Sequence, residues 1–247
     1  IRLVRGAQYR MELHALRTYR HLFFDLDHTL WDFRTNSRTV LRELYSELDM
    51  AGAGIPDAGA MIEVYEEINA DLWKRMEDGR IGKEVMRVLR FRNTLLRFGV
   101  KDDRLARVLG EEYLERTPRM SGLFPGTLQV LMELRPLFGL HIITNGFEAQ
   151  QASKIRHSGL QGLFDHVVTS ESAGSAKPDP RIFRKALKLA DAEPGESLMI
   201  GDSVSADMAG ARTVGMDHAH FHPDDEGDPL ATYRIRGMDA LRAIVMG

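Results

Sequence analysis

Two carboxylates follow an apolar run in the stretch "HLFFDLDHTL", residues 21–30. Asp25 and Asp27 stand one residue apart at the end of this run. Carboxylate oxygens are ligands of the kind that Mg²⁺ prefers. Like charges repel strongly away from water, so a pair in this setting implies a bound cation or a raised pKa. The alternative is an ordinary polar turn after a strand.

Other reactive side chains follow later apolar segments. Thr144 and Asn145 end one segment, and Asp202 ends another. Lys177 lies in a loop between them. Each has an ordinary explanation, since Asn-Gly is a common turn pair and a loop lysine is usually solvated. Together, however, carboxylates, an ammonium and a hydroxyl suit an anionic, oxygen-rich substrate held with Mg²⁺, above all a phosphate.

The elements that must position these residues alternate in the second half of the chain. Strands are expected at 19–25, 140–145, 166–170, 197–202 and 216–221, and helices at 126–136, 148–158, 179–190 and 204–214. This alternation predicts an α/β fold, a doubly wound parallel sheet with helices on both faces. Ligands bind such sheets beyond the carboxyl ends of the strands, where the polar residues fall.

A helical segment interrupts this alternation after the first strand. From about Asn36 to Arg116 the apolar residues recur at helical spacing, in four stretches with short joints. Four consecutive helices indicate a small bundle. We therefore expect a core domain of residues 1–33 and 118–247, with an inserted helical domain at 34–117.

Composition narrows the function classes. The chain has 247 residues, a formal net charge of -3, 43% apolar residues and no cysteine. The charge gives no basic field for a nucleic acid partner, and no apolar run is long enough for a membrane span. The lack of cysteine fits a cytoplasmic protein. Residues 1–20 are rich in arginine and lack an apolar run, so no signal peptide is expected.

Four segments resemble, in order, the motifs of the haloacid dehalogenase-like (HAD) hydrolase superfamily. They are "DLDHT" at 25–29, "TN" at 144–145, "KPD" at 177–179 and "GDSVSAD" at 201–207. The helical insertion resembles the α-helical cap of that superfamily, on a Rossmann-like core. The segments most similar to its pyrimidine 5'-nucleotidase branch are "ITNGF" at 143–147, 170–183 and 72–91.

The resemblance implies roles for the carboxylates. Asp25 would be the nucleophile that forms an aspartyl-phosphate, and Asp27 the general acid and base. Asp25, the backbone carbonyl of Asp27, and Asp202 would hold Mg²⁺. Asp207 would orient the loop or Lys177. True haloacid dehalogenases lack the acid two residues after the nucleophile, so Asp27 favours phosphate chemistry.

The resemblance also implies how a substrate is bound. Thr144, with the backbone N–H of Asn145, would hold phosphoryl oxygens, and Lys177 would neutralise charge on them. In the cap, Arg90 and Trp73 are candidates to contact a nucleoside. The alternative explanations are bundle core for Trp73 and a solvated surface for Arg90.

The function that follows is a Mg²⁺-dependent phosphatase acting on small phosphate monoesters, with nucleoside 5'-monophosphates as the preferred candidates. Alternatives on the same scaffold are a phosphoglycolate-type phosphatase and a β-phosphoglucomutase-like phosphosugar mutase. A non-enzymatic binding protein is a third alternative, against which the intact set of polar residues speaks. The expected partner is a small molecule, with the protein a monomer or homodimer.

Overall fold

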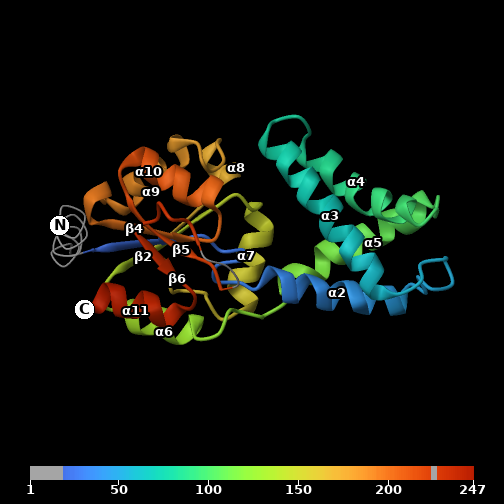
Figure 1. Ribbon diagram of the computed structural model, residues 1–247, viewed down its shortest axis with the longest axis horizontal. Helices are drawn as coiled ribbons and strands as arrows, with labels where there is room; N and C mark the ends of the chain where they lie inside the picture. The colour runs from blue at the N-terminus through green and yellow to red at the C-terminus, as the bar shows by residue number, and fades with distance from the viewer. Residues whose placement is uncertain (1–18, 224–226) are drawn as a thin grey trace, which may run out of the picture. The chain divides into compact units, whose positions relative to one another are not determined.

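A computed structural model of the chain describes residues 19–223 and 227–247. The chain divides into two compact units (Figure 1). One comprises the described parts of Ile1–Asp32 and Leu123–Gly247, and the other comprises Phe33–Gly122. No signal peptide was expected in residues 1–20, and nearly all of that segment lies outside the described residues. No helix within the described ranges is long and apolar enough to cross a membrane.

The first unit is built on one parallel sheet, as predicted. Its strands are β1 (His21–Phe24), β2 (Gly139–Thr144), β3 (His166–Thr169), β4 (Ser197–Gly201), β5 (Asp217–Phe221) and β6 (Tyr233–Ile235). Their spatial order is β3-β2-β1-β4-β5-β6, and every neighbouring pair runs parallel. The doubly wound α/β fold is confirmed.

Burial explains why the central strands are continuously apolar. Leu22, Phe23 and Phe24 of β1 are all fully buried, because helices cover both faces of the sheet. The helices of this unit are α6 (Thr127–Leu134), α7 (Glu148–His157), α8 (Ser170–Ala173), α9 (Pro180–Ala190), α10 (Ala209–Val214) and α11 (Met238–Met246). Figure 1 shows α9 and α10 on one side of the sheet, and α6 and α11 on the other.

The chain order of the strands reverses next to β1. From β1 the chain goes to β2 and β3 on one side and later to β4, β5 and β6 on the other. Phe24 pairs with Ile142 on β2 and with Ile200 on β4, and the Asp25 N–H donates to the Ile200 carbonyl at 2.8 Å. The residues that follow β1, β2 and β4 therefore meet at the switch point, where such folds bind ligands.

The periphery of this unit differs from the sequence prediction. Strand β6 and helices α8 and α11 were not predicted. The three residues of β6 are too few to show an alternating pattern. The single helix expected at 204–214 is instead a π-helical turn, Val204–Met208, followed by α10. π-helical turns inside helices occur frequently at functional sites.

The second unit contains four helices, as predicted. They are α2 (Phe33–Glu47), α3 (Ala58–Glu77), α4 (Lys83–Arg97) and α5 (Asp103–Arg116), followed by a 3₁₀ turn at Thr117–Arg119. Its buried core includes Leu41, Tyr65, Phe91 and Leu109. Asn36 on α2 donates to the Gly122 carbonyl at 2.8 Å and accepts from its N–H at 3.1 Å. This pairing ties the end of the unit to its first helix.

Candidate active site

Three carboxylates converge at the switch point. Oxygens of Asp25, Asp202 and Asp207 all lie within 4.8 Å of one another. Asp25 directly follows β1, Asp202 directly follows β4, and Asp207 lies in the π-helical turn. Asp25 and Asp207 are buried, whereas Asp202 is half-buried. The sheet topology thus brings residues far apart in the sequence to one edge.

Lys177 lies among these carboxylates. Its Nζ is 2.5 Å from Asp25 Oδ1 and 2.6 Å from Asp207 Oδ1. It also donates to the Ile143 carbonyl at 2.8 Å. Burial opposes its positive charge, but the two carboxylates outweigh burial and raise the pKa of Lys177. Lys177 is therefore a cation at neutral pH.

The charge balance of the cluster suits a divalent cation. Burial raises the pKa of Asp25 well above its usual value, Lys177 opposes this, and the charges of Asp207 and Asp202 add to it. Burial and the Asp207 charge also raise the pKa of Asp202. One ammonium does not balance three carboxylates, and Mg²⁺ prefers such oxygen ligands. This set of oxygen donors fits magnesium. That Asp25 and Asp202 are its ligands stays a prediction.

The Asp27 side chain belongs to a different environment. Lys154 Nζ contacts both of its oxygens, at 2.6 and 2.7 Å, and Gln151 Nε2 donates to Oδ2 at 2.8 Å. Burial alone would raise the pKa of Asp27, but Lys154 and Gln151 hold it below its usual range. Only the backbone carbonyl of Asp27 was predicted to contact the metal, and that role stays a prediction.

Gln151 and Lys154 did not emerge from the sequence as candidate site residues. Both lie on α7, which follows β2, and both side chains are buried, with 0% and 5% exposure. Residues three apart lie on the same face of a helix. The available signal was this spacing on the helix that follows Thr144, but a glutamine and a lysine on a helix usually indicate a solvated face.

Thr144 and Asn145 are held by different partners. Thr144 Oγ1 accepts from the Gly146 N–H at 3.0 Å and from Gln151 Nε2 at 2.9 Å. The Asn145 amide donates to the Lys177 carbonyl at 3.1 Å and accepts from the Lys177 N–H at 2.7 Å. The Asn145 side chain therefore fixes the loop of Lys177, and its predicted contact with substrate would use the backbone N–H.

The predicted nucleoside contacts lie in the helical unit. Trp73 on α3 is half-buried. Arg90 on α4 is only 5% exposed, and its guanidinium lies 5.4 Å from the Phe91 ring and 5.1 Å from the Tyr113 ring. The alternative explanation of Arg90 as a solvated surface residue is wrong. Its role in binding substrate stays a prediction.

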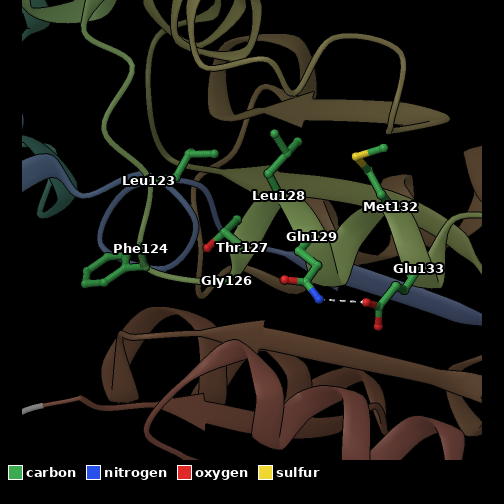
Figure 2. Close-up of a pocket in the computed structure, with 8 residues that line it drawn as sticks. All are labelled: Leu123, Phe124, Gly126, Thr127, Leu128, Gln129, Met132 and Glu133. Carbon is green, nitrogen blue, oxygen red and sulfur yellow. Dashed lines mark hydrogen bonds between the residues drawn. The ribbon is translucent and has the colours of Figure 1, made fainter.

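A separate hollow of about 690 Å³ lies along α6 (Figure 2). Leu123, Leu128 and Met132 contribute apolar side chains to its lining. Its one charged residue, Glu133, accepts from Gln129 at 3.0 Å and from Arg242 at 3.1 Å. The hollow shares no residue with the carboxylate cluster.

Known proteins resemble this chain along most of its length. Residues 19–215 match the model of the haloacid dehalogenase-like hydrolase family. The chain is 29% identical to the HAD-hydrolase YfnB of Bacillus subtilis over 234 residues, covering 93% of this chain and 97% of that protein. The crystal structure of YfnB bound to magnesium superposes with a TM-score of 0.84, covering 94% of this chain and all of that one.

Two further relatives carry the name pyrimidine 5'-nucleotidase. PynA of Streptococcus pneumoniae is 31% identical over 207 residues, covering 83% of this chain and 84% of that protein. YjjG of Escherichia coli is 30% identical over 211 residues, covering 83% of this chain and 89% of that protein. With the matched family model and the carboxylate cluster at the switch point, these similarities show that the chain belongs to the haloacid dehalogenase-like hydrolases.

Proposed function

We propose that this protein is a Mg²⁺-dependent phosphatase that hydrolyses nucleoside 5'-monophosphates through an aspartyl-phosphate. The main support is the contrast between two carboxylates one residue apart. Asp25 lies in a cluster with Asp202 and Lys177, where a metal and a phosphate would be bound. Asp27 is turned onto Lys154 and Gln151 instead. One carboxylate is thus placed to attack and the other to move a proton.

The chemistry proceeds in two steps. An Asp25 oxygen attacks phosphorus and the ester P–O bond breaks. The departing alcohol oxygen takes a proton from the acid form of Asp27, which is the minor form while Lys154 contacts both carboxylate oxygens. Water then attacks the phosphoryl group, Asp27 takes a proton from it, and the bond from phosphorus to the Asp25 oxygen breaks. Inorganic phosphate is released, and Asp25 is regenerated as a carboxylate.

Other side chains hold the transferring group. Lys177 supplies a buried positive charge beside Asp25, and Thr144 and the Asn145 N–H supply hydrogen bonds to phosphoryl oxygens. Asp25, Asp202 and the backbone carbonyl of Asp27 would hold Mg²⁺. When bound, the ion screens the repulsion between the Asp25 carboxylate and the phosphate dianion.

The choice of nucleotides as substrates is supported by the relatives and by the helical unit. PynA and YjjG, which match most of the chain, are named as pyrimidine 5'-nucleotidases. Arg90 and Trp73 are proposed to contact the nucleoside, because an arginine and a tryptophan can bind a base by hydrogen bonding and stacking.

The test is a phosphate-release assay with Mg²⁺ on pyrimidine nucleotides, purine nucleotides, sugar phosphates and phosphoglycolate. We expect turnover to be fastest with nucleotides and to be lost in Asp25→Asn, since no phosphoenzyme could form. A mutase would instead convert hexose 1-phosphate without releasing phosphate. An enzyme that turns over none of these esters would refute the proposal.

A further inference from the structure

Gln151 and Lys154 form a buried polar pair on one face of α7. Lys154 Nζ contacts both oxygens of Asp27, at 2.6 and 2.7 Å. Its ammonium also lies 4.7 Å from the centre of the Trp31 ring, which is fully buried. A cation held between a carboxylate and an aromatic face has little freedom to move. The orientation of the Asp27 carboxylate is therefore set by α7.

The Gln151 amide bridges two groups that the proposed reaction uses. Nε2 donates to Asp27 Oδ2 at 2.8 Å and to Thr144 Oγ1 at 2.9 Å. The opposite amide orientation would place Oε1 against the Asp27 carboxylate, and two acceptors would repel each other. Gln151 thus contributes both of its N–H groups to this bridge.

The bridge fixes the direction of the Thr144 hydroxyl. Thr144 Oγ1 already accepts from Gln151 and from the Gly146 N–H at 3.0 Å. A hydroxyl has two acceptor lone pairs and one hydrogen to donate. With both lone pairs in use, the hydroxyl acts as a donor, which suits a phosphoryl oxygen.

We propose that Lys154 and Gln151 are positioning residues for the two steps: Lys154 holds the proton-transferring carboxylate of Asp27, and Gln151 directs the Thr144 hydroxyl. This inference rests on the proposed phosphatase function. Stability alone is a weak explanation, since buried ion pairs are often no more stable than apolar packing of similar volume.

The two residues should leave different kinetic signatures. The need for proton donation by Asp27 depends on how basic the departing oxygen is, so Lys154 matters most for alkyl esters. A nitrophenolate leaves without a proton. The Thr144 hydroxyl binds the phosphoryl group itself, so Gln151 matters for every ester.

The experiment compares kcat/KM for p-nitrophenyl phosphate and for the best nucleoside 5'-monophosphate in Lys154→Met and Gln151→Met. This ratio reports the first step, in which the leaving group departs. For Lys154→Met we expect a fall of about 100-fold with the nucleotide and below about threefold with the nitrophenyl ester. For Gln151→Met we expect similar falls with both esters, on the order of tenfold or more.

Control variants separate positioning from folding. Arg156→Met changes an exposed residue of the same helix and should alter neither value. Lys154→Arg keeps the charge and should recover part of the nucleotide activity even if Lys154→Met does not fold. If Lys154→Met lowers kcat/KM equally for both esters, or for neither, or if Lys154→Arg recovers nothing, the inference is overturned. A wild-type protein that hydrolyses neither ester would instead refute the proposed phosphatase function.

Discussion

Asp25 and Asp27 carry the same chemical group in opposite electrostatic settings. Burial raises the pKa of Asp25 above its usual value, whereas Lys154 and Gln151 overcome burial and lower that of Asp27. The two carboxyl groups therefore differ in environment, although only one residue separates them in the sequence. The sequence located the pair, but not the partners that separate the two environments.

The environment of Arg90 leads to a prediction about substrate binding. Among the described residues, neither Nε nor Nη2 of Arg90 has a hydrogen-bond partner, although both atoms are buried. The guanidinium packs against the Phe91 and Tyr113 rings, which leaves Nε and Nη2 to hydrogen-bond a ligand. We expect Arg90→Met to raise KM for the nucleotide by about tenfold while changing the free energy of unfolding by less than about 1 kcal/mol.

Steady-state kinetics and urea denaturation check this prediction together. Arg92→Met serves as the control, because Arg92 lies on the same helix but is exposed. An unchanged KM in Arg90→Met would remove Arg90 from the substrate site. A large loss of stability would indicate a structural role in the helical bundle.

At the element scale, three histidine rings stack on one another across neighbouring strands. His141 on β2 lies with its ring 5.4 Å from the rings of His21 on β1 and His166 on β3. Burial lowers the pKa of His141 to about 4, and the positive charges of His21, His166 and Arg135 add to the effect, while Asp165 opposes it. His141 is therefore neutral in the folded protein over a range in which the unfolded chain would bind a proton.

This difference predicts acid sensitivity. Because the folded pKa lies below the unfolded value of about 6.5, the contribution of His141 is complete above that pH. It is lost as the pH falls toward about 4, by on the order of 2–3 kcal/mol. Urea denaturation across this range should show a smaller loss in His141→Leu than in the wild type. His157→Leu, at an exposed histidine, should keep the wild-type slope, and equal slopes in all three proteins would contradict the assignment.

The elements themselves were predictable to different degrees. Strands β1, β2 and β4 are apolar runs that end in polar residues, so the sequence located both the strands and the candidate site. Strand β6 escaped because it has three residues at the sheet edge. Lys154 and Gln151 escaped because only the packing of α7 against the strand ends distinguishes them from solvated helix residues.

At the scale of the whole molecule, magnesium should stabilise the fold. The ion would bind the assembled carboxylates and not the unfolded chain, so at a hundredfold excess over Kd it adds about 2.7 kcal/mol. We expect the melting temperature to rise with Mg²⁺, and the rise to be largely lost in Asp202→Asn. Calorimetry with and without a chelator measures this.

A matched control for this measurement is Asp239→Asn, which changes an exposed carboxylate on α11. That variant should keep the full response to Mg²⁺. A response that persists undiminished in Asp202→Asn would remove Asp202 from the proposed ligands while leaving the phosphatase chemistry to be judged by the ester panel.

The central position of β1 has a consequence for biosynthesis. His21 pairs with Gly139 on β2 and with Ser197 on β4, and the whole helical unit lies between β1 and these neighbours in the sequence. During translation, β1 leaves the ribosome long before either hydrogen-bonding neighbour exists, while the helical unit can complete its own contacts at once. The apolar residues 22–24 of β1 therefore remain exposed to chaperones and to aggregation until most of the chain has been made.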